Sequence, residues 1–117
     1  MDSVETFDEL RKVIDENNGL LTIEMQKLRD LGGHGRLGVH VRDAISKKLE
    51  GLGVAHYPKE LPQYQHERVR LYIRGSAVSD LINAVLEVGE EQDQALRGAA
   101  AAEAENVLRE VRALVCG

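Results

Sequence analysis

The fold is decided in residues 38–58, which read GVHVRDAISKKLEGLGVAHYP. From Val39 the apolar residues recur every three or four positions, and this period predicts an amphipathic helix. Glycines at positions 51 and 53 end that helix. The short run from Val54 to Tyr57 then predicts a strand. The expected inner stripe of the helix is Val41, Ala44, Ile45, Lys48, Leu49 and Leu52.

Two shorter helices are expected before this stretch. Thr6 and Glu9 have the spacing of a capping box, so a first helix begins there, and residues 17–19 (Asn-Asn-Gly) end it. The next apolar residues, 20–22, can form a small strand, and Thr22 can cap a second helix. Four glycines in residues 32–38 exclude a stable helix interior and predict a turn. The apolar residues expected on the second helix are Ile23, Met25, Leu28 and Leu31.

A second long strand is expected in residues 68–74, where apolar and polar residues alternate strictly. Val69, Leu71 and Ile73 then face the core, because successive side chains of a strand point to opposite faces. Residues 58–67 form a loop, since their two prolines are excluded from a central strand. The outward row of the strand is Arg68, Arg70, Tyr72 and Arg74.

Two helices are expected in the remaining residues. Ser76 can cap the first, which runs up to Gly89 and whose apolar stripe helps to close the core. The final stretch, from about Glu90, is rich in Ala and Glu and favours helix strongly. Its apolar residues repeat with the 4,3 spacing of a heptad seam. The two stripes are Leu81, Ile82, Val85 and Leu86, and Ala100, Ala104, Val107, Val111 and Leu114.

This order of helix, short strand, helix, glycine turn, helix and two-stranded hairpin resembles the winged helix-turn-helix superfamily. The resemblance covers roughly residues 5–88 and is carried by residues 38–49 and 53–58, which are similar to its recognition helix and first wing strand. We therefore expect an α+β fold with a winged helix-turn-helix domain (three helices plus a β-hairpin wing) in residues 1–88. A C-terminal helical segment follows in residues 89–117. The resemblance implies DNA binding, with the third helix in the major groove and the hairpin on the backbone.

The charge of the chain is unevenly distributed around its formal net value of −5. Residues 25–76 carry ten Lys and Arg against five Asp and Glu, and they hold all four His. Residues 1–24 and 77–117 are both acidic. A basic segment between acidic flanks predicts a polyanionic partner.

The candidate DNA contacts lie on the third helix, in the turn before it and on the last strand. Arginines at period two are spaced by about 6–7 Å along a strand, a distance comparable to the spacing of phosphates. The candidates for groove contact are His40, Arg42, Ser46 and Lys47, and those for phosphate contact are Arg36, Arg68, Arg70 and Arg74.

Two acidic residues, Asp43 and Glu50, share the presented face of the third helix. Each can accept a hydrogen bond from a cytosine amino group, but each also repels phosphates. Two simpler interpretations stay open at this point. The helix can be an ordinary amphipathic one with a solvated face, and the arginines can pair with Glu60, Glu67 or the acidic flanks.

Other functional classes find little support. The single Cys116 excludes an intramolecular disulfide and a cysteine zinc site, and the histidines show no metal-ligand spacing with a carboxylate, so no metal is expected. Residues 32–38 lack the Gly-Lys-Ser/Thr ending of a nucleotide-binding loop, so no cofactor is expected. No catalytic motif indicates an enzyme. No apolar run approaches the roughly 20 residues that span a bilayer, so we expect a soluble, cytoplasmic chain with no membrane partner.

These observations predict a non-enzymatic regulator of transcription that binds double-stranded DNA. We expect it to act as a homodimer joined through the C-terminal helix, because two-fold DNA sites require a second copy. The alternative is a winged-helix module that docks its basic face on an acidic partner protein. Both functions use the same scaffold, so the sequence leaves the choice between them open.

Overall fold

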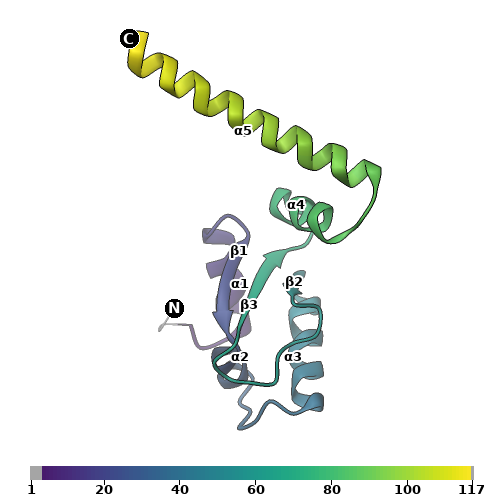
Figure 1. Cartoon of the computed structure of the whole chain (residues 1–117). Coiled ribbons are helices and arrows are strands. Elements are labelled where there is room, and N and C mark those ends of the chain that lie inside the picture. Colours follow the sequence, from purple (N-terminus) through teal and green to yellow (C-terminus); the bar gives the residue numbers. More distant parts are fainter. Residues whose placement is uncertain (1–3, 117) are drawn as a thin grey trace. The chain divides into compact units, whose positions relative to one another are not determined.

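The computed structural model describes residues 4–116, with the backbone alone for residues 104–108, 110, 111 and 113–116. The chain is α+β, with helices and a small antiparallel sheet in an order compatible with a winged-helix layout (Figure 1). It divides into two compact units between Ser79 and Asp80. The elements are α1 (Phe7–Glu16), β1 (Leu20–Glu24), α2 (Met25–Leu31), α3 (Val39–Gly51), β2 (Val54–Tyr57), β3 (Arg68–Ile73), α4 (Ala77–Leu86) and α5 (Glu90–Cys116).

The first helix begins and ends where the sequence predicts. Thr6 Oγ1 accepts a hydrogen bond from the Glu9 amide at 3.1 Å, so the predicted cap is confirmed. The Glu9 carboxylate accepts from the Glu5 amide at 3.2 Å, one residue earlier than a standard capping box requires. After α1 the chain reverses through Asn18 and Gly19, with φ of 60° and 83°, which are values that asparagine and glycine tolerate best.

The second helix begins later than predicted, because Thr22 belongs to the sheet. Thr22 pairs with Arg70 in the β1–β3 ladder, where its β-branched side chain fits well, so the prediction that it caps α2 was wrong. The helix begins at Met25 without a side-chain cap. Its first two amides instead donate to carbonyls of the β2–β3 loop, Met25 to Glu67 at 2.9 Å and Gln26 to Gln65 at 2.8 Å. These bonds satisfy donors that a helix start leaves unpaired.

The sheet has the strand order β1-β3-β2, and both pairs are antiparallel. Val69 pairs with Ile23 and Leu71 with Leu21, so the predicted inward face of β3 is confirmed by its neighbours. On the opposite face Arg70 stands between Thr22 of β1 and Tyr57 of β2. Tyr72 shares that outward face, yet it is only 6% exposed.

The core of the first unit lies between the inward face of the sheet and the three helices. α1 packs on β1 and β3, α2 on β1, and α3 on β2. From α3 only Ile45 and Leu49 are fully buried, whereas Ala44 and Lys48 are exposed and were wrongly placed in the inner stripe. The other side chains below 2% exposure are Leu10 and Ile14 of α1, Met25 and Leu28 of α2, and Val54, Val69 and Leu71 of the sheet.

The cap predicted for α4 is confirmed, because Ser76 Oγ accepts from the Ser79 amide at 3.1 Å. Its apolar stripe is not buried as predicted. Leu81, Val85 and Leu86 are 48%, 65% and 47% exposed. The helix predicted from about Glu90 is present as α5, 27 residues long. Of its heptad seam, Ala100 is exposed, and the side chains of Ala104, Val107, Val111 and Leu114 lie outside the description.

Candidate nucleic-acid interface

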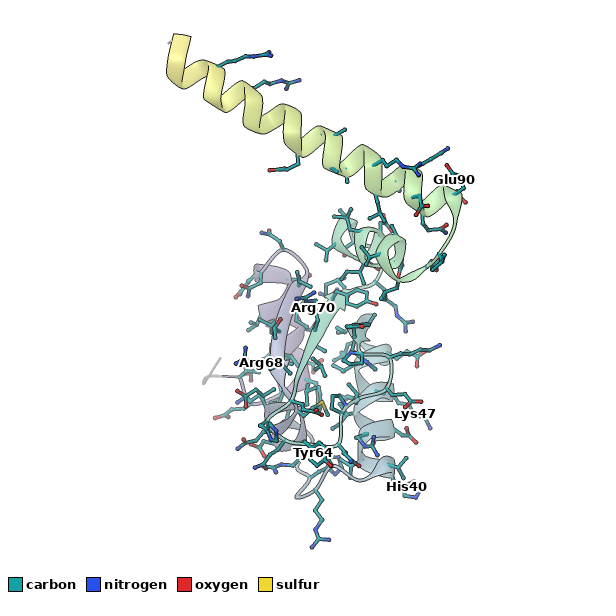
Figure 2. The ribbon with its side chains drawn as sticks, in the orientation of Figure 1. His40, Lys47, Tyr64, Arg68, Arg70 and Glu90 are labelled. Carbon is teal, nitrogen blue, oxygen red and sulfur yellow. The ribbon has the colours of Figure 1, made fainter. Side chains whose placement is uncertain are left out.

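The exposed side of α3 carries a short polar row. His40, Asp43 and Lys47 are all exposed, and they stand at positions i, i+3 and i+7, which share one face of a helix. Figure 2 shows His40 and Lys47 projecting from α3 on the side away from the sheet. Within the part of the chain that the structure describes, these three side chains make neither a hydrogen bond nor an ion pair. They are therefore available to a ligand.

Arg42, which the sequence predicts as a groove contact, is held by the protein itself. Its Nε donates to the Leu37 carbonyl at 3.1 Å, and one terminal nitrogen donates to the Leu61 carbonyl at 3.1 Å. The side chain is half-buried. Arg42 therefore joins α3 to the turn before it and to the β2–β3 loop.

Ser46, a second predicted groove contact, is also hydrogen-bonded within the protein. Its hydroxyl lies 2.9 Å from His56 Nε2, and His56 Nδ1 lies 2.7 Å from the Pro58 carbonyl. A carbonyl oxygen only accepts, so His56 Nδ1 carries the proton that it donates. In neutral His56, Nε2 then accepts from the Ser46 hydroxyl. This chain of hydrogen bonds fixes α3 to β2 and to the start of the following loop.

The β2–β3 loop, residues 58–67, folds back on the domain. Leu61 is 4% exposed and joins the core. Gln65 accepts a hydrogen bond from the Arg29 guanidinium at 2.7 Å, and its carbonyl accepts from α2. Tyr64 and His66 lie with their rings stacked, 6.2 Å between centroids. The loop that would form the wing is therefore fixed to α2 and α3.

The turn between α2 and α3 leaves Arg36 exposed beside a buried Leu37. Gly38 precedes the first turn of α3 and gives it no side-chain cap. A helix start with free amides carries partial positive charge. Arg36 and the first turn of α3 thus place positive charge at the start of the helix, next to His40.

The arginines predicted for phosphate contact do not form one line with α3. Arg68 and Arg70 are exposed on the outward face of the sheet, the face opposite the helices (Figure 2). Arg68 stands across from Glu24 in the β1–β3 register. Arg74 lies beyond the end of β3, with its guanidinium 3.9 Å from the Glu50 carboxylate of α3. The structure therefore joins Arg74 to α3 and leaves Arg68 and Arg70 on a separate surface.

Lys59 is a candidate that sequence reasoning missed. It lines a hollow of about 320 Å³ between α3 and the start of the loop, together with Asp43 and Glu60. The signal in the sequence was Leu61, an apolar residue inside a polar loop, which indicates that the loop returns to the core. A loop that returns to the core brings its one lysine, Lys59, beside α3.

No helix among the described residues is long and apolar enough to cross a bilayer. Comparison with family models, with curated proteins and with solved structures gives no match.

Proposed function

We propose that this chain is a non-enzymatic protein that binds double-stranded DNA through the exposed face of α3 and acts in the regulation of transcription. The observation that carries the proposal is the free row His40, Asp43 and Lys47 on the third helix of a helix–turn–helix–hairpin order. In winged-helix proteins that helix enters the major groove. An α-helix fits the width of the groove, and its exposed polar side chains meet the base edges.

The charge around α3 supports a polyanionic ligand. Arg36, Lys47, Lys48 and Lys59 are exposed at or near α3, within a chain whose formal net charge is −5. Cations gathered on one part of an acidic chain favour local binding to phosphates over general attraction to nucleic acid. Arg36 and Lys59 flank the row and are our candidates for phosphate contact beside the groove.

The proposal includes a homodimer formed through the second unit. Four of its apolar side chains are strongly exposed: Leu81, Val85, Leu86 and Val88, the last of them fully. Exposed apolar residues of this kind favour a protein partner, and most soluble oligomers are symmetric assemblies of identical chains. A two-fold dimer would present two α3 helices to a DNA site with two halves. The lone Cys116 is consistent with a reducing cytoplasm.

The test is fluorescence anisotropy of a labelled random duplex, titrated with the full chain over a series of salt concentrations. We expect binding at low salt that weakens as salt rises, because phosphate contact releases counterions. Lys47→Ala should weaken binding about tenfold, because it removes a donor to the base edges. Arg36→Ala should instead flatten the salt dependence by about one charge, because it removes a phosphate contact. Lys12→Ala removes the same charge from the exposed side of α1 and should change binding little.

The competing function is docking on an acidic partner protein. The observation that favours it is Asp43 among the cations of the presented face, because a protein surface can place a cation opposite Asp43 and DNA phosphates cannot. Absence of duplex binding by the folded full chain at low salt would refute the DNA proposal and favour this alternative. Equal losses in Lys47→Ala and Lys12→Ala would show attraction without a defined site. Either result would show that α3 does not read the major groove.

A further inference from the structure

The structure reduces the groove-facing side chains of α3 to a small set. Arg42 is bonded to two carbonyls, and Ser46 to His56, so neither can turn toward a base without breaking a contact of the fold. Glu50 lies beside the Arg74 guanidinium at 3.9 Å. On the face of α3 that His40 shares, Asp43 and Lys47 remain as free charged groups, one turn apart. Lys48 is exposed too, but it lines a hollow beside Phe7 and Leu31 on another side of the helix.

These two side chains have simple and opposite hydrogen-bonding capacities. An ionised carboxylate only accepts, and a lysine ammonium only donates. In the major groove cytosine presents only an amino donor, and guanine presents only two acceptors, N7 and O6. Adenine presents one acceptor beside one donor, and thymine presents one acceptor beside a methyl group. A lysine therefore finds two acceptors only on guanine, and a carboxylate finds an amino donor without a neighbouring acceptor only on cytosine. The pair Asp43 and Lys47 is therefore complementary to cytosine and guanine.

The composition of α3 points the same way. The side chains that read adenine with two hydrogen bonds are Asn and Gln, which combine a donor with an acceptor. The sequence of α3, VHVRDAISKKLEG, contains neither. We propose that α3 selects C·G base pairs, with Asp43 accepting from a cytosine amino group and Lys47 donating to a guanine. This inference rests on the proposed DNA binding and specifies the kind of site that is bound.

The spacing of the pair fits neighbouring base pairs. Residues four apart on a helix advance by about 6 Å, with about 5–6 Å between their Cβ atoms. Stacked base pairs are about 3.4 Å apart along each strand. Two side chains separated in this way reach bases that are one or two steps apart. A C·G step, or two C·G pairs with one pair between them, satisfies both.

Asp43 also weakens binding to DNA sites that lack a cytosine at the matching position. Its charge repels phosphates at every sequence. A cytosine amino group offsets that repulsion with a hydrogen bond, whereas at adenine the N7 acceptor beside the amino group also repels the carboxylate. Specificity is a difference between affinities, so weaker binding elsewhere counts as much as a gained contact. The carboxylate that argues against tight general binding to DNA thus favours selective binding.

The experiment compares two labelled duplexes of equal length, one of C·G pairs in mixed order and one of A·T pairs, by anisotropy at one salt concentration. The full chain should bind the C·G duplex about tenfold more tightly. Asp43→Asn keeps the size of the side chain, removes the repulsion and creates an adenine reader. It should bind the A·T duplex more tightly than the unmodified chain does. The ratio of the C·G affinity to the A·T affinity should therefore fall from about ten to about one, or below one. Asp8→Asn, the same change on the exposed side of α1, should leave the preference unchanged.

The possible failures are distinct. If the unmodified chain binds both duplexes equally, the C·G inference is overturned while the DNA-binding proposal stands. If Asp43→Asn retains the full preference with unchanged far-ultraviolet circular dichroism, Asp43 does not read cytosine and the inference is again overturned. If no duplex is bound, the proposed function itself fails and the inference fails with it.

Discussion

Replacing Arg42 with alanine should destabilise the fold rather than alter DNA selection directly. The substitution removes two hydrogen bonds, from the guanidinium to the carbonyls of Leu37 and Leu61. A hydrogen bond from a charged donor contributes about 1.5–3 kcal/mol, and the half-buried position puts each bond at the low end, so the free energy of unfolding should fall by about 2–3 kcal/mol. With a urea m-value of about 1–1.5 kcal/mol/M for a small domain, the unfolding midpoint should fall by about 2 M.

The assay is urea unfolding followed by tyrosine fluorescence. The chain has three tyrosines, at positions 57, 64 and 72, and no Trp, so the signal reports on the first unit alone. Arg36→Ala is the matched control, because Arg36 is exposed and its loss should change stability by less than about 0.5 kcal/mol. Arg42→Lys keeps the charge without the forked donor and should fall between the two. Equal stability of Arg42→Ala and Arg36→Ala would refute this role for Arg42.

Three further predictions follow from the packing and the exposed surfaces. Leu49→Ala empties a fully buried position of α3 and should lower the free energy of unfolding by about 2–5 kcal/mol in the same urea assay; a loss below about 1 kcal/mol would contradict the described core. Ser46→Ala removes the hydroxyl that His56 contacts and should lower it by about 1 kcal/mol, and a neutral effect would show that the hydrogen bond does not stabilise the domain. Val85→Glu places a charge on the exposed apolar side of α4 and should convert a dimer into a monomer in sedimentation equilibrium, whereas Ala77→Glu, at an exposed position ahead of that surface, should not; an unchanged mass for Val85→Glu would exclude this surface from the dimer.

The elements with strong local signals could be predicted from the sequence. The capping residues Thr6 and Ser76 each predicted a helix start that the structure confirms. The strict alternation of residues 68–74 predicted β3 and its inward face. These signals are local, because a cap involves four residues and a strand has a period of two.

The errors arose where a tertiary contact overrode a local preference. Threonine is a residue type that often caps helices, but the pairing of Thr22 with Arg70 across the sheet places it in β1. The start of α2 is set instead by carbonyls from a loop some forty residues later, and no sequence pattern shows that. Leu81 and Val85 have helical periodicity, which indicates an apolar face without saying what covers it.

The candidate site was predicted in part for the same reason. Helical projection placed Lys47 and His40 on the exposed side of α3, and both are exposed. Projection gives direction but not hydrogen-bond partners, so it could not show that Arg42 and Ser46 are held by the loop and by His56. Asp43 departs from the usual basic pattern of such helices, and it is the residue that most restricts which base pairs the proposed site would bind.

The central claim, that α3 is the surface that meets duplex DNA, is tested most directly by nuclear magnetic resonance. Backbone amide shifts of the labelled full chain are followed while a C·G duplex is added. The account predicts that the largest changes fall on residues 36–47, with His40, Asp43 and Lys47 among them, while Arg68 and Arg70 on the outward face of the sheet change little. Changes concentrated at Arg68 and Arg70, with α3 unaffected, would contradict it.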